Sequence, residues 1–169
     1  MKRALVSLGV GPHQELLNLV EPTFRAYADR FGYELVTHTE SVDGSRPVVW
    51  SKIPLIVQAL RTYDEVFWVD ADAIVLRFDR DVATCVRPDT EFAWAVHEYG
   101  LGSLPNAGVL FVRATDQAFR ALETAYAQHD LIDHPWSDNA ALLRTLGYGI
   151  PGFEPKLERP LVDLRVEHL

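Results

Sequence analysis

Two aspartates, Asp70 and Asp72, are the residues whose types and spacing point most directly to chemistry. They follow the apolar run 66–69, whose continuous hydrophobicity predicts a strand buried on both faces. Ligands of open α/β sheets bind beyond the carboxyl ends of the strands, which is where this pair falls. Carboxylate oxygens suit Mg²⁺ or Mn²⁺, which keep substrate phosphate in their remaining positions. A solvated turn is the ordinary alternative, and the buried strand favours the metal site.

Two further polar residues stand at the ends of predicted elements. Lys52, at the start of a predicted helix over 53–60, could reach a sugar hydroxyl or a phosphate, or it could be a surface residue beside a core tryptophan. Asn106 precedes two small residues at the entry to a predicted strand over 109–112, so a ligand could approach the backbone closely there. A turn that merely begins the strand is the alternative for Asn106.

The last third of the chain adds a carboxylate, an amide and an imidazole. Asp138, followed by Asn139, could cap a predicted helix over 138–146 or could present its carboxylate to a reacting sugar. His168 could supply a nitrogen ligand, which would favour Mn²⁺ over Mg²⁺, or it could be an ordinary surface residue. Aromatic rings form stacking platforms for carbohydrates, although they pack equally well in a core. The candidate sugar or acceptor contacts are Trp50, His97, Tyr99 and Trp136.

The elements that must position these residues alternate between strands and helices. Strands are predicted over 4–10, 33–37, 66–69, 92–96 and 109–112, and helices over 16–31, 53–60, 117–128 and 138–146. The segments 40–49 and 97–105 are predicted as loops, and the chain from 147 onward as irregular. This alternation predicts an α/β fold with a Rossmann-like, mostly parallel sheet flanked by helices. No repeat or internal linker is visible, so we expect one catalytic domain over 1–169.

Composition excludes several classes of protein. The 169 residues include 16 basic and 24 acidic side chains, giving a net charge of −8, which argues against a nucleic-acid partner. Cys85 is the single cysteine, so the chain cannot form an internal disulfide. No stretch approaches the ~20 apolar residues of a membrane-spanning helix. These features predict a cytoplasmic protein without a membrane span.

Taken in order, five segments resemble the galactosyl-, mannosyl- and xylosyltransferase family, which includes yeast Golgi mannan enzymes and plant xyloglucan xylosyltransferases. The segments are 25–33, 50–54, 63–73, 106–108 and 135–139. Their order and spacing are far more specific than the Asp-Ala-Asp triplet alone. Glycogenin-like and bacterial lipopolysaccharide glycosyltransferases are similar more distantly. The resemblance implies the GT-A fold of nucleotide-diphospho-sugar transferases.

The resemblance also implies roles for individual residues. Asp70 and Asp72 would hold Mn²⁺ (or Mg²⁺) against the diphosphate of a nucleotide-sugar donor, with His168 standing where the family's third ligand is expected. Asp138 and Asn139 would lie beside the anomeric carbon of a retaining enzyme, and a UDP-sugar is the favoured donor. The implied donor contacts are Val6 and Ser7 at the nucleotide base, Lys52 and Ala71, and Asn106 and Ala107 at the transferred sugar.

The sequence departs from the family in two respects. The eukaryotic relatives carry a membrane anchor that this sequence lacks, which predicts a bacterial, cytoplasmic form. Family chains also continue past the histidine, whereas this sequence ends at Leu169, so recognition of a carbohydrate or glycoconjugate acceptor could depend on a homo-oligomer or another partner.

Two other functions stay open. One is a phosphohydrolase with Asp70 as an aspartyl nucleophile. The three elements that precede Asp70, and the lack of a second acidic pair, disfavour this function. The other is a non-catalytic nucleotide-sugar-binding protein, which the intact set of candidate residues makes less attractive.

Overall fold

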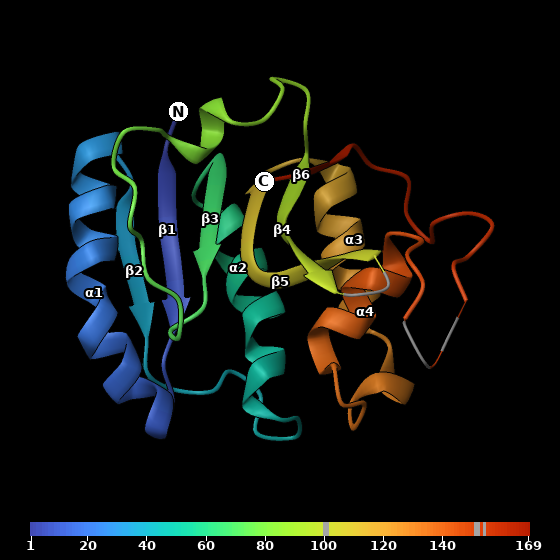
Figure 1. Cartoon of the computed structure of the whole chain (residues 1–169). Coiled ribbons are helices and arrows are strands. Elements are labelled where there is room, and N and C mark those ends of the chain that lie inside the picture. Colours follow the sequence, from blue (N-terminus) through green and yellow to red (C-terminus); the bar gives the residue numbers. More distant parts are fainter. Residues whose placement is uncertain (100–101, 151–152, 154) are drawn as a thin grey trace.

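A six-stranded sheet with the strand order β2-β1-β3-β5-β4-β6 forms the centre of the molecule (Figure 1). The computed structural model describes residues 1–99, 102–150, 153 and 155–169. The strands are β1 (Arg3–Leu8), β2 (Glu34–His38), β3 (Glu65–Val69), β4 (Phe92–Tyr99), β5 (Gly102–Arg113) and β6 (Val166–His168). Strand β5 is antiparallel to both of its neighbours, and the other three pairings are parallel. The predicted α/β class with a mostly parallel sheet is confirmed.

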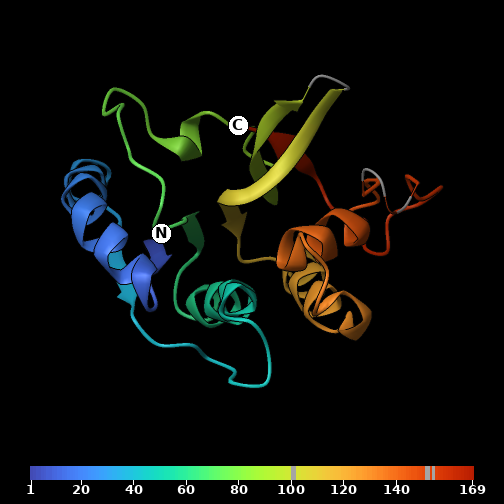
Figure 2. The ribbon, with the colours of Figure 1, turned by 60° about the horizontal axis from the view of Figure 1, so that its bottom comes forward.

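Helices cover both faces of this sheet (Figures 1 and 2). They are α1 (Pro12–Phe31), α2 (Lys52–Leu60), α3 (Asp116–Tyr126) and α4 (Ser137–Thr145). Because side chains alternate along a strand, Leu5 and Phe67 pack on the α1 side, whereas Val6 and Trp68 pack with α2, α3 and α4. Among the helices in the described part of the chain, none has the length and apolar character needed to cross a membrane.

The first helix agrees with its sequence signals at both ends. Pro12 occupies its first turn, and Gly32 ends it with φ of 72°, a left-handed conformation that glycine adopts without steric cost. Pro22 lies inside the helix, which continues through it as one element.

The predicted loop over 97–105 is wrong. Strands β4 and β5 continue as an antiparallel hairpin, and only residues 100 and 101 of that segment lie outside the described residues. The register of the hairpin shifts between Trp94, which pairs with Leu110, and Ala95, which pairs with Asn106. Residues 107–109 therefore bulge away from β4. Bulges of this kind re-aim side chains and are common beside active sites.

Candidate active site

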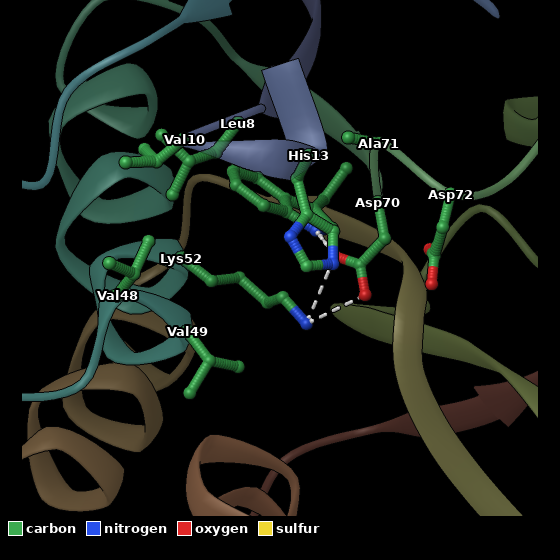
Figure 3. Close-up of a pocket in the computed structure, with 10 residues that line it drawn as sticks. Leu8, Val10, His13, Val48, Val49, Lys52, Asp70, Ala71 and Asp72 are labelled. Carbon is green, nitrogen blue, oxygen red and sulfur yellow. Dashed lines mark hydrogen bonds and ion pairs between the residues drawn. The ribbon is translucent and has the colours of Figure 1, made fainter. Parts of the chain in front are cut away.

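A pocket of about 250 Å³ lies beyond the carboxyl ends of β1 and β3. It is lined by Leu8, Val10, His13, Val48, Val49, Lys52, Trp68, Asp70, Ala71 and Asp72, and we call it the first pocket. Apolar side chains occupy one side of it and the two aspartates the other, with Lys52 extending between them (Figure 3). The first pocket thus combines an apolar slot with a strongly charged end.

Asp70 is held in a fixed orientation at the charged end. Trp68 Nε1 donates a hydrogen bond to Asp70 Oδ1 over 2.6 Å, and the Asp70 backbone N–H donates to the Gly108 carbonyl on β5 over 2.8 Å. Lys52 Nζ lies 3.1 Å from Asp70 Oδ1 and 3.2 Å from Oδ2. The strand end and two side-chain donors therefore fix the carboxylate against the wall of the first pocket.

Lys52 also reaches Asp138, so that one buried ammonium joins two carboxylates. Lys52 Nζ lies 3.1 Å from Asp138 Oδ2, and the two residues are only 4% and 3% exposed. Burial alone would lower the pKa of Lys52, but the carboxylates of Asp138 and Asp70 raise it to about 12. Burial raises the pKa of Asp138, against the opposing effect of Lys52. Lys52 is therefore a charged member of a buried network, and the surface alternative for it is wrong.

Gly108 leaves room for this arrangement. A Cβ at Gly108 would lie 2.8 Å from Asn106 Oδ1 and 3.2 Å from Asp70 Oδ2, both closer than ordinary van der Waals contact. Asn106 Oδ1 accepts a hydrogen bond from the Gly108 backbone N–H over 2.7 Å, which fixes the bulge from the inside. The bulge thus brings the side chains of Asn106 and Asp70 close to the same glycine.

A second pocket, of about 220 Å³, is lined by His97, Leu104, Pro105, Asn106, Trp136 and Asn139. Asn139 connects α4 to the bulge, because its Oδ1 accepts a hydrogen bond from the Ala107 backbone N–H over 2.9 Å. Predicted site residues from three separate segments of the chain thus line this second pocket: His97, Asn106, and the pair Trp136 and Asn139.

The charged end of the first pocket fits a hard divalent cation. Asp70 and Asp72 line this end of the pocket against the single positive charge of Lys52, so negative charge is in excess there. Asp72 is exposed. Within the described residues no group of three metal-ligating side chains forms. Mg²⁺ is commonly bound in this way, by one or two carboxylates together with substrate phosphate and water.

Several residues expected to contact the donor or the acceptor lie elsewhere. Val6 and Ser7 are fully buried in strand β1, and neither is among the residues that line the first pocket. Trp50 is fully buried too, and its Nε1 donates to the Ile132 carbonyl over 3.2 Å, which makes it a core residue. Ala107 is 2% exposed with its N–H already used by Asn139, so it lies behind the wall of the second pocket. The side chain of Tyr99 lies outside the described residues.

His168 is not brought to the two aspartates. It lies on edge strand β6 and pairs with Trp94, which pairs with Leu110, which in turn pairs with Trp68. Three strand spacings place His168 roughly 14 Å across the sheet from Trp68. Its Nε2 lies 3.3 Å from the Tyr148 hydroxyl instead.

The sequence reasoning missed five residues that line the first pocket, Leu8, Val10, His13, Val48 and Val49. The predicted loop over 40–49 includes the two valines, yet they begin a short 3₁₀ helix, Val48–Ser51, that runs directly into α2. Both side chains are partly exposed and line the apolar side of the first pocket. No periodic pattern in the sequence marks them.

Two solved structures that superpose on this chain are glycosyltransferases. A glycosyltransferase involved in the glycosylation of the major capsid of PBCV-1 superposes over all of this chain and 81% of its own, with a TM-score of 0.70 and 15% identity. The glycosyltransferase GlyE of Streptococcus pneumoniae TIGR4 superposes over all of this chain but only 45% of its own, with a TM-score of 0.58 and 16% identity. The chain therefore has the predicted GT-A fold.

The family described as the galactosyl transferase GMA12/MNN10 family matches residues 11–90. The resemblance predicted from the sequence is confirmed over these residues, which include His13, Lys52, Asp70 and Asp72. Asp138 and all the residues that line the second pocket lie beyond the matched range. No curated protein matches the chain significantly in sequence. The fold and the family match together support a glycosyltransferase.

Proposed function

We propose that the protein is a metal-dependent, retaining glycosyltransferase that moves a sugar from a nucleotide-diphosphate donor, with UDP-sugar favoured, to a carbohydrate or glycoconjugate acceptor. The observation that carries this proposal is the buried Lys52 that joins Asp70, on the wall of the first pocket, to Asp138 beside the second. The apolar slot of the first pocket suits a nucleobase, and its charged end suits a metal-bound diphosphate.

In this proposal Asp70 and Asp72 hold the cation, which when bound supplies Lewis-acid stabilisation of the departing diphosphate. Lys52 adds a fixed positive charge at the same end of the pocket, already oriented by its two carboxylate partners. A preoriented charge costs no reorganisation as negative charge develops on the leaving group. The first pocket thus favours departure of the nucleoside diphosphate.

The second pocket is where the sugar and the acceptor meet in this proposal. Trp136 offers a ring for stacking, and Asn106 and Asn139 offer amides close to the Gly108 bulge. Asp138, buried next to Asn139 in the chain, contributes negative charge that stabilises the oxocarbenium-like centre. Retention of configuration is proposed on the family match. The choice between hexosyl and pentosyl transfer, a cytoplasmic location and a homo-oligomer stay predictions.

Calorimetric titration tests the proposal directly. UDP and GDP are titrated into the protein with and without Mn²⁺, and the titrations are repeated with Asp72→Asn and with Asp79→Asn. Asp79 is the matched control, since it is an exposed aspartate of the following loop, paired with Arg77. We expect metal-dependent binding of one nucleotide that Asp72→Asn abolishes and Asp79→Asn leaves intact. Binding of neither nucleotide by folded protein overturns the proposal.

A further inference from the structure

Arg46 lies just before Val48 and Val49 in the chain, and it connects this segment to the C-terminal end of α3. Its Nη1 donates a hydrogen bond to the carbonyl of Tyr126, the last residue of α3, over 2.6 Å. Its guanidinium lies 4.0 Å from the centre of the Tyr126 ring and 5.1 Å from that of Trp50. The Arg46 side chain is 6% exposed, so this cation is held inside the structure rather than in solvent.

Asp43 contacts both Tyr126 and Arg46. The Tyr126 hydroxyl donates to Asp43 Oδ2 over 2.7 Å, and Arg46 Nε lies 3.7 Å from the same oxygen. Hydrogen bonds from Ser45 and Tyr126 lower the pKa of Asp43 to about 2. Arg46 Nη2 also faces His129 Nδ1 at 3.2 Å. We call Asp43, Arg46 and Tyr126 the latch.

The latch lies immediately before the wall of the first pocket. Val48 and Val49, which line the pocket, follow Arg46 by two and three residues. Lys52 follows them at the first position of α2. The two valines therefore lie between two attachments to the rest of the fold, the latch before them and the buried Trp50 after them, and the latch fixes the end of the wall at which the chain enters it.

We propose that Arg46 is a positioning residue for nucleotide binding. Through the latch it holds Val48 and Val49 at the distance from Leu8 and Val10 at which these apolar side chains contact a bound nucleobase. This inference rests on the proposed function, in which the first pocket takes a nucleoside diphosphate. Arg46 lines a different hollow, between α2 and α3, so it acts on the nucleotide only through the wall.

Arg3 provides a matched control. Like Arg46, it donates to the carbonyl of the last residue of a helix, Phe31 of α1. It stacks on a tyrosine, Tyr33, at 4.4 Å and pairs with an aspartate, Asp81. Arg3 is the first residue of β1, and the first pocket lies at the opposite end of that strand. Replacing either arginine removes the same kinds of contact, but only one is attached to the pocket wall.

The test is calorimetric titration of Mn²⁺ with UDP, or with GDP if the wild type binds that instead, into the wild type, Arg46→Ala and Arg3→Ala. We expect both variants to unfold at a lower temperature, and only Arg46→Ala to bind the nucleotide more weakly, by about tenfold. Equal affinity in the two variants overturns the inference, because the latch would then serve stability alone.

Two outcomes separate this inference from the proposed function. If the wild type binds neither nucleotide, the proposed function fails and the inference fails with it. If the wild type binds but Arg46→Ala does not fold, Tyr126→Phe replaces it, because that change removes only the hydroxyl that reaches Asp43. We expect Tyr126→Phe to weaken nucleotide binding about threefold. An affinity equal to that of the wild type overturns the inference.

Discussion

Replacing Gly108 with alanine introduces a methyl group next to Asp70, which lines the first pocket, and Asn106, which lines the second. The new Cβ would lie 2.8 Å from Asn106 Oδ1 and 3.2 Å from Asp70 Oδ2. Asp70 has little freedom to retreat, because Trp68 Nε1 and Lys52 Nζ both hold its carboxylate. Asn106 must move further than Asp70, and its Oδ1 then loses the hydrogen bond from the residue 108 N–H. The backbone of Gly108 does not have a positive φ, so alanine is strained there only by lack of space.

The expected magnitude follows from these contacts. Overpacking of this kind costs about 1–3 kcal/mol of unfolding free energy, which includes the lost hydrogen bond. For a domain of this size the midpoint of thermal unfolding should fall by about 2–12 °C. Nucleotide affinity in the presence of Mn²⁺ should fall at least about tenfold, because the displaced carboxylate is one of the two proposed metal ligands.

Calorimetric titration and thermal unfolding measure these two effects separately. Gly44→Ala is the matched control, since a Cβ at Gly44 has nothing within 4 Å. That control should be neutral or slightly stabilising and should bind nucleotide as the wild type does. If Gly108→Ala is folded and binds Mn²⁺ with the nucleotide as tightly as the wild type, then nucleotide binding does not require Asp70 to occupy its present position.

Three further predictions rest on other contacts. Lys52→Gln leaves Asp138 buried without a cation, so we expect a loss of about 3–5 kcal/mol in urea unfolding; an unchanged midpoint would contradict the buried ion pair. Asp81→Asn weakens the partly buried ion pair with Arg3, so the free energy of unfolding should fall by about 1–3 kcal/mol while the nucleotide affinity stays that of the wild type. A nucleotide affinity that falls in calorimetric titration of this variant would contradict the prediction. Asp43 should titrate in carboxyl-carbon NMR with a pKa of about 2, below the ordinary value near 3.9. Because this pKa is depressed in the folded state, its contribution to stability is present above pH ~4 and is lost as the pH falls toward 2, and Asp43→Asn should remove that dependence.

The position of Asp70 and Asp72 after strand β3 could be predicted from the sequence. The apolar run that forms β3 marks a buried strand, and two carboxylates after such a strand must lie at the ligand-binding edge of the sheet. Asn106 before two small residues predicts that a ligand approaches the backbone there; in the structure the side chains of Asn106 and Asp70 lie against Gly108. These signals are local, so a single sequence contains them.

The hairpin and the last strand could not be predicted in the same way. Glycines around position 101 and Pro105 are typical of a loop, and proline inside a sheet is tolerated mainly at edges and bulges. Here Pro105 lies next to the register shift of β5, where the ladder is already interrupted. Strand β6 is only three residues long, and its place beside β4 depends on tertiary contacts that leave no periodic pattern in the sequence.

The network of buried charges depends on contacts between segments that are far apart in the chain. A lysine at the start of a helix is usually exposed, and nothing near Lys52 in the sequence indicates that Asp138 will arrive beside it from α4. Ser137, with φ of 40°, starts α4 in a conformation that non-glycine residues rarely adopt, directly before Asp138. Such a residue persists only where its surroundings fix it, and here the backbone N–H and the hydroxyl of Ser137 both donate to the His134 carbonyl, over 2.8 and 3.0 Å. The two residues that follow are held by distant segments, Asp138 by Lys52 and Asn139 by the Ala107 N–H. Because these partners are far apart in the chain, the buried network leaves no local pattern in the sequence.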